Sequence, residues 1–265
     1  MSEFGRRAFL RGTGTFALLG LVSPKRLAQL AAAPTAAGQQ GHFLTAHELA
    51  TLRAVTDRFL PGPPEDDHPG ALDAHCAEAI DLLLGAFTFV PPLIHAGGPF
   101  SGRAGGSHDD FADFVPLDAH AELGWRIRIE GSRGRKEREF GGRVVGLQQE
   151  YRDGLAHLDG RATALGAADF ASLPAPLQVV VLSDQTDDAV QSFVGTALSH
   201  TIDAMYGPPE YGGNQGLVGW SQIGWQGDTQ PRGFSVAQVT TSGGAATLTT
   251  QRTAARQAFD KFLVR

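Results

Sequence analysis

The side chains best suited to acid–base chemistry lie near the end of one predicted helix. His200 and Asp203 are three positions apart there, which puts both on one helical face. A histidine beside a carboxylate can act as a general base, and a catalytic dyad would need a nucleophile nearby, such as Ser199. Such a pair more often caps a helix or ties the loop that follows it. The residues are therefore compatible with a catalytic dyad and with a structural tie.

Other sequence patterns for catalysis or cofactor binding are missing. The nine histidines include no HxxxH or HExxH spacing, and no G-x-S-x-G segment marks a serine hydrolase. The single cysteine, Cys76, excludes an internal disulfide and an all-cysteine metal cluster, and we expect it to be a buried apolar residue. The glycine-rich segment 102–107 lacks the strand and the GK[ST] of a phosphate-binding loop. We therefore expect no catalytic constellation, metal or cofactor in this chain.

Residues 205–225 read MYGPPEYGGNQGLVGWSQIGW and form the most unusual segment of the sequence. Four of the six Tyr and Trp residues lie here, among glycines that permit close backbone approach and prolines that stop a helix. Such aromatic side chains are favoured at protein interfaces. The segment could seal the core as a packed loop, dock a partner, or line a small-molecule site. In the last case a stand-alone sugar-binding protein or enzyme would use Tyr211, Asn214, Trp220 and Trp225, with His200 as acid or base.

The first 37 residues have the features of an export signal. Arg6 and Arg7 are followed by Phe9 and Leu10, then by a short, weakly apolar run and several alanines. A charged start, a short apolar stretch and small residues are typical of a secretory leader, and the paired arginines indicate the twin-arginine route. The apolar run is too short to span a bilayer. We expect residues 1–37 to be a twin-arginine leader and the protein to be exported to the periplasm or the outer face of the cytoplasmic membrane.

The charge balance disfavours a nucleic-acid partner. The chain has 22 basic and 28 acidic residues, and the leader holds five of the basic and one of the acidic ones. The body that remains has 17 basic and 27 acidic residues, whereas nucleic acids bind surfaces rich in Lys and Arg.

The periodicity of apolar residues predicts a mainly α, single multi-helix domain over residues 42–265. A capping box, Thr45 with Glu48, opens the first helix, and Pro61-Gly62 ends it. Further helices are expected over 71–87, 144–166, from about Ala175, over 188–206 and over 252–264. Residues 121–142 carry the densest charge, which fits a solvated helix or turn, or a basic patch facing a partner. A short β-hairpin could form around residues 243–244.

One block of the sequence resembles a known family. The helix over 188–206, then P-x-Y-G-G-N, then G-W-x-x-I-G with an aromatic-x-Gly, is similar to the signature of the gluconate 2-dehydrogenase subunit 3 family. The matching residues are Pro209, Tyr211, Gly212, Gly213, Asn214, Gly219, Trp220, Ile223, Gly224, Trp225 and Gly227. The resemblance covers about residues 42–230, and the leader is also typical of the family. Residues beyond about 235 have no counterpart in it.

The resemblance implies an accessory role rather than catalysis. Members of this family are small γ subunits that bind a large FAD-containing dehydrogenase subunit of the glucose–methanol–choline (GMC) type, and a c-type cytochrome often completes the complex. The small subunit carries the twin-arginine signal, engages the twin-arginine translocase and takes its folded partner along; it is also thought to aid maturation. FAD is then expected in the partner, whose substrate is a sugar, sugar acid or alcohol. His200 and the loop residues named above become candidates for partner binding or for shaping the loop.

Overall fold

The computed structural model describes residues 40–95, 116–139, 141–207, 209 and 212–225. Within these ranges the chain forms helices and no strand, which confirms a mainly α, single-domain fold. The helices are α3 (Ala46–Phe59), α4 (Cys76–Leu84), α5 (Ala119–Glu130), α6 (Leu147–Ala164), α7 (Ala175–Leu182), α8 (Asp188–Tyr206) and α9 (Val218–Gln222). The expected leader, hairpin and C-terminal helix lie outside the described residues.

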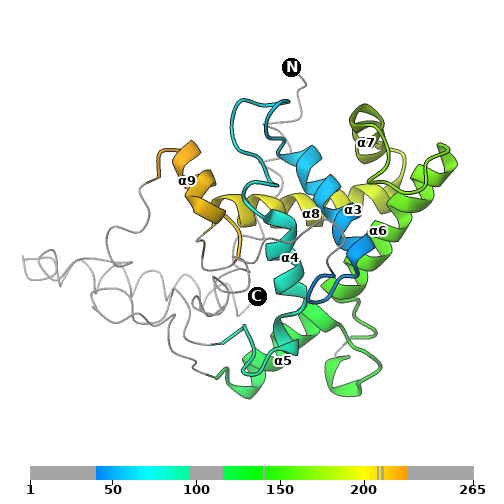
Figure 1. Ribbon diagram of the computed structural model, residues 1–265. Coiled ribbons are helices and arrows are strands. Elements are labelled where there is room, and N and C mark those ends of the chain that lie inside the picture. Colours follow the sequence, from blue (N-terminus) through cyan, green and yellow to red (C-terminus); the bar gives the residue numbers. More distant parts are fainter. Residues whose placement is uncertain (1–39, 96–115, 140, 208, 210–211, 226–265) are drawn as a thin grey trace, which may run out of the picture.

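Helix α4 forms the centre of the bundle, packed against α3 and α8 (Figure 1). We predicted a helix over 71–87, and its start needs correction. The helix begins only at Cys76, because residues 71–75 form turns and His75 has a left-handed backbone with φ of 56°. It is buried on nearly all sides, since eight of its nine residues are buried.

The start of α3 is fixed by the predicted capping box. The Thr45 side chain accepts from the Glu48 amide, and the Glu48 carboxylate accepts from the Thr45 amide at 2.8 Å. Just before this cap, the Asp81 carboxylate on α4 accepts three consecutive backbone N–H groups, those of residues 42–44. The segment that leads into α3 is therefore hydrogen-bonded to the central helix, and these bonds satisfy backbone N–H groups that have no partner within a helix.

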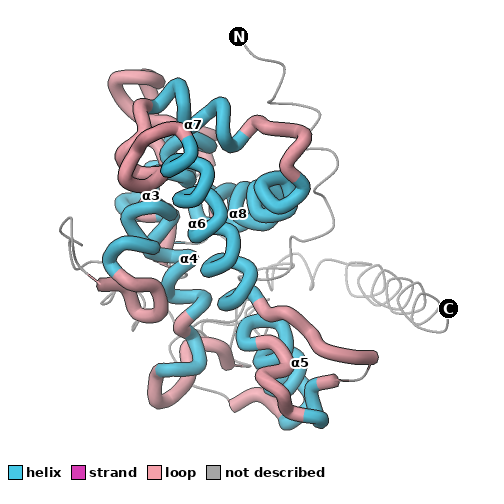
Figure 2. The backbone as a smooth tube through the Cα atoms, turned by 90° about the vertical axis from the view of Figure 1, so that its right-hand side faces the viewer, coloured by secondary structure: helices cyan, strands magenta, loops and turns pink. Residues whose placement is uncertain are grey.

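The long helices α6 and α8 pack along one another and supply much of the remaining core (Figure 2). The apolar residues Leu147, Tyr151, Leu155 and Leu158 of α6 are buried. Val145, which lies within the predicted range 144–166, is half-exposed because it precedes the helix. On α8, Phe193 lies against Gly154 of α6 so closely that a Cβ at Gly154 would collide with its ring. A glycine is therefore needed at this helix contact.

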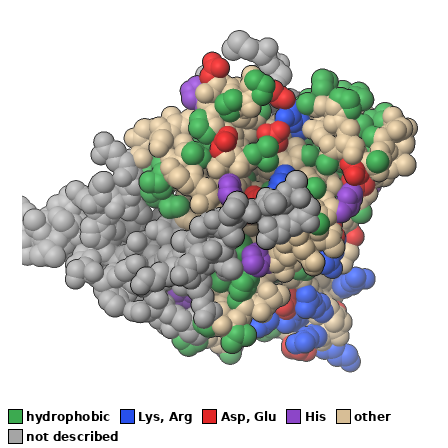
Figure 3. Space-filling model, in the orientation of Figure 1, with side chains coloured by type: hydrophobic (Ala, Val, Ile, Leu, Met, Phe, Trp, Pro, Cys, Tyr) green, Lys and Arg blue, Asp and Glu red, His purple; other side chains and the backbone are tan. Residues whose placement is uncertain are grey.

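Three arginines in and after α5 are paired with acids of the same segment. Arg138 is buried and donates to Glu130 at 2.8 Å, and Arg126 donates to Glu122 at 2.7 Å. Arg133 lies 3.6 Å from Glu130 as well. Lys and Arg side chains gather at the lower edge of the molecule in Figure 3. Arg135 and Lys136 lie exposed beside these pairs, so the segment is compatible both with a solvated turn and with a basic patch that faces a partner.

Candidate functional site

The unusual loop forms a compact junction between the end of α8 and α9, which we call the α8–α9 junction (described residues 200–207, 209 and 212–225) (Figure 1). Asn214 organises it. Its side chain is fully buried, donates to the Gly207 carbonyl at 3.1 Å and accepts from the Gly219 amide at 2.9 Å. Its backbone is left-handed, with φ of 48°, a conformation that Asn tolerates better than most residues. One side chain thus joins the end of α8 to the first turn of α9.

Two glycines let the backbone of the junction approach α8 directly. A Cβ at Gly213 would collide with the carbonyl of Ala204, and a Cβ at Gly219 would collide with the carbonyl of Met205. Both glycines are buried. Their role is therefore close packing against the last turn of α8 rather than flexibility.

The aromatic residues of the junction also serve its packing. The Trp220 indole N–H donates to the carbonyl of Tyr206 at 2.8 Å, which satisfies a carbonyl at the end of α8. The Tyr206 hydroxyl donates to Gln222 at 3.3 Å. Beneath them, Cys76 and Met205 belong to a small second core. Cys76 is fully buried and burial raises the pKa of its thiol, as expected for a residue that packs rather than reacts.

Three large apolar side chains in the described part of the junction are exposed to solvent. Ile223 is 58% exposed and Trp225 is 53% exposed. Leu217 is 43% exposed and has a left-handed backbone with φ of 58°, which is unusual for a leucine. We call these three residues the α9 edge. Sequence reasoning missed Leu217, since a single leucine between a glycine and a valine gives no signal of exposure.

Some of the remaining predicted loop residues are buried or partly buried, and others are exposed. Pro209 and Trp220 are partly buried, Gly212 is buried, and Gly224 is exposed with φ of 68°. Tyr211 lies outside the described residues, as do Arg6, Arg7, Phe9 and Leu10 of the leader.

His200 is part of the core rather than of an exposed site. Its Nδ1 shares a 2.8 Å hydrogen bond with the Tyr151 hydroxyl of α6, and the two rings stack. Burial, and then the charge of Arg128, lower the pKa of His200 to about 4, so the ring is neutral near pH 7. Asp203 is partly buried, which raises the pKa of its carboxyl to about 6. These contacts favour the structural interpretation: His200 ties α8 to α6.

The pocket of a stand-alone sugar-binding protein is not favoured by this geometry. Both ends of the Asn214 amide and the Trp220 indole N–H are already bonded to backbone groups, so they are not available to a ligand. Among the residues that the structure describes, no group of three or more His, Cys, Asp or Glu could hold a metal ion. None of the described helices combines the length and the apolar character needed to cross a membrane.

The comparisons with known proteins gave one match. The family model for gluconate 2-dehydrogenase subunit 3 matches residues 46–227, from the first residue of α3 to just beyond the α9 edge. No curated protein and no solved structure matches the chain. The matched range covers most of the sequence and includes every described helix and the whole α8–α9 junction. The chain therefore belongs to the gluconate 2-dehydrogenase subunit 3 family.

Proposed function

We propose that this chain is a non-catalytic accessory subunit that binds an FAD-dependent dehydrogenase of the GMC type. The observation that carries the proposal is the family match across the whole described domain. The geometry supports it in one respect: the residues that first suggested catalysis, His200 and the polar groups of the α8–α9 junction, have their hydrogen bonds within the fold. The reaction, on a sugar, sugar acid or alcohol, then takes place at the FAD of the partner.

The α9 edge is our candidate for contact with this partner. The buried part of the junction holds Leu217, Ile223 and Trp225 in place, since α9 is bonded to the end of α8 through Asn214. A large, half-exposed tryptophan just after a helix, with its amide bonded to the carbonyl of Trp220, is the kind of side chain that dominates binding energy when a partner covers it. Here the junction has two roles, since its buried side seals α8 and its exposed side binds.

The leader provides a biological reason for the two proteins to associate, namely export of the complex. We propose that Arg6 and Arg7 direct the folded chain to the twin-arginine translocase, and that a bound dehydrogenase without a leader of its own is exported with it. Assistance in maturation of the flavoprotein, and a c-type cytochrome as a further subunit, belong to the same proposal. This part rests on the sequence of residues 1–37 and on the family's character.

Co-expression with the FAD subunit tests the proposal. The full chain should co-purify with the flavoprotein, and Trp225→Ala should weaken the complex by about 2 kcal/mol or more, as loss of an interface tryptophan commonly does. Val145→Ala is the matched control, because Val145 is also half-exposed but lies before α6, away from the α9 edge. A chain that binds no FAD subunit, or that oxidises a sugar by itself, would contradict the accessory role.

A further inference from the structure

Helix α7 is apolar on its outer as well as its inner surface. Its sequence, APLQVVVL, contains no ionisable residue. The inner side buries Gln178, Val181 and Leu182. On the outer side, Leu177 is 39% exposed, Val179 49% and Val180 59%; we call these three residues the α7 face. A hydrophobic patch is visible at the upper right of Figure 3, where Figure 1 places α7. Helices that are hydrophobic all round are normally buried.

The composition of the α7 face offers no advantage to the chain alone. Valine is a weaker helix former than alanine, leucine or lysine, because its β-branched side chain loses rotamer freedom in a helix. At an exposed position, packing does not compensate for that loss. Val179 and Val180 therefore become favourable only when another surface covers them.

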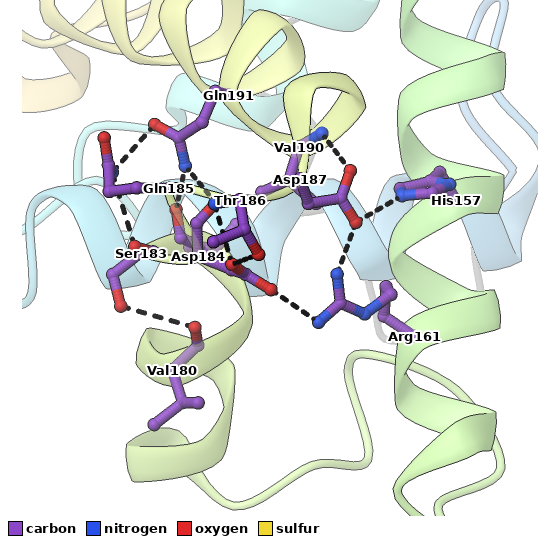
Figure 4. Close-up of polar contacts among 11 residues, drawn as sticks. His157, Arg161, Val180, Ser183, Asp184, Gln185, Thr186, Asp187, Val190 and Gln191 are labelled. Atoms are coloured by element: carbon purple, nitrogen blue, oxygen red, sulfur yellow. Dashed lines mark hydrogen bonds and ion pairs between the residues drawn. The ribbon is translucent and has the colours of Figure 1, made fainter.

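Hydrogen bonds from the middle of α7 and at its C-terminal end hold the α7 face in a fixed position. On the inner side, the Gln178 amide donates to the carbonyl of Phe170 at 3.0 Å. After the helix, the Gln191 amide of α8 donates to the carbonyl of Leu182 at 3.3 Å and to that of Asp184 at 2.9 Å (Figure 4). A fixed surface loses little conformational freedom when it is bound, which favours affinity.

Two carboxylates beside α7 are paired with cations of α6. Figure 4 shows Arg161 of α6 between Asp184 and Asp187, with His157 donating to Asp187 at 2.9 Å. The Thr186 hydroxyl, followed by Arg161, lowers the pKa of Asp184 to about 2, so this carboxylate is firmly ionised. Asp184 and Asp187 share the guanidinium of Arg161, and Asp188 beside them is exposed, so the border of the α7 face carries more negative than positive charge.

We propose that the α7 face is a second docking surface for the FAD-containing catalytic subunit, an inference that rests on the proposed function. The matching partner surface has an apolar centre and a basic rim. The apolar centre of the partner surface would cover the uncharged α7 face. Its basic rim would meet the exposed Asp188 beside this face and the excess of acidic residues in the body of the chain, 27 against 17 basic. A second copy of this chain would instead bring like charges together at the rim, which disfavours self-association.

The α7 face is separate from the α9 edge. Helix α7 precedes the start of α8, and α9 follows its end, so the 19 residues of α8 place them about 28 Å apart. A standard interface of about 800 Å² per partner is roughly 30 Å wide, so one large subunit can reach both. The two surfaces together would hold the partner along the length of α8.

Val180→Glu in the full chain, co-expressed with the catalytic subunit, tests the inference. The charge should weaken binding at least about tenfold, because a carboxylate would be buried without a counter-charge. The melting temperature of the isolated chain should stay near that of the wild type, since the residue is solvent-exposed. The matched control is Val145→Glu, an exposed valine beyond the other end of α6, which should bind as the wild type does.

A second variant guards against misfolding. Val180→Ala favours the helix and removes only part of the apolar contact, so we expect weaker binding with no loss of stability. Unchanged binding of both Val180 variants would overturn the inference while leaving the proposed function intact. Failure of the wild-type chain to bind the catalytic subunit would remove both. If the variants abolish self-association of the chain instead of binding to the flavoprotein, the occupant is a second copy and the inference is wrong.

Discussion

Asn214→Ala is the substitution expected to damage the α8–α9 junction most selectively. The change removes the acceptor of the buried Gly219 amide and the donor to the partly buried Gly207 carbonyl. A buried group left without its partner costs about 1–3 kcal/mol. Alanine must also adopt the left-handed backbone, with φ of 48°, that asparagine tolerates better, which adds roughly 1 kcal/mol.

We therefore expect Asn214→Ala to lower the free energy of unfolding by about 3 kcal/mol. That is a large part of the roughly 5–15 kcal/mol that holds an ordinary domain together. Asn214→Gly separates the two causes, because glycine accepts the left-handed backbone and loses only the hydrogen bonds. It should be about 1 kcal/mol more stable than the alanine variant.

Urea denaturation of the purified chain, followed by tryptophan fluorescence, measures these differences. The indole of Trp220 is bonded within the junction and reports on it directly. Gln149→Ala is the control, since this exposed amide on α6 bonds only to Asp153 among the contacts of its side chain, and we expect a change within about 0.5 kcal/mol. An Asn214→Ala variant within about 1 kcal/mol of the wild type would refute the view that Asn214 organises the junction.

Three further substitutions test other parts of the account. Burial raises the pKa of Asp203 from 3.8 to about 6, so its folded form retains a proton between these values and stability falls as the pH rises through them. Asp203→Asn should remove this pH dependence and raise the free energy of unfolding by about 1 kcal/mol above pH 6, as measured by chemical denaturation. This value is reduced because solvent partly screens the carboxyl. The hydrogen bond from His157 is the main cause that lowers the pKa of Asp187, so the ionised carboxylate contributes to folding stability above about pH 4, and this contribution is lost as the pH falls. Asp187→Asn should keep the helix cap but lower the melting temperature at pH 7, and the difference from the wild type should shrink in acid. Replacing Arg6 and Arg7 by Lys should leave the chain and its flavoprotein in the cytoplasm, as measured by cell fractionation, and continued export would contradict the escort role.

Much of the helical framework could be predicted from the sequence, because it depends on local patterns. The capping box at Thr45 and the apolar positions of α6 from Leu147 are present as expected. The start of α4 was wrong because nothing in the sequence marks His75 as left-handed. The predicted start of the helix at residue 144 was wrong, because the apolar pattern already begins at Val144 and Val145, before the helix begins at Leu147.

The candidate site was harder to predict, because its character depends on contacts between distant residues. The sequence identified the glycines and aromatic residues of the junction but could not show that Asn214 and Trp220 use their polar atoms on the end of α8. The partner of His200, Tyr151, is 49 positions away and not the nearby Asp203. The exposure of Val179 and Val180 also could not be read from an apolar run that suits a buried helix equally well.

The central claim is that this chain binds a flavoprotein and performs no oxidation itself. Its most direct test is gel filtration of the full chain, alone and mixed with the FAD-containing subunit, with flavin absorbance and dehydrogenase activity measured on each fraction. We predict that flavin absorbance and activity follow the partner, that the two proteins elute together, and that the chain alone has neither. Separate elution of the two proteins, or sugar oxidation by the chain alone, would contradict the account.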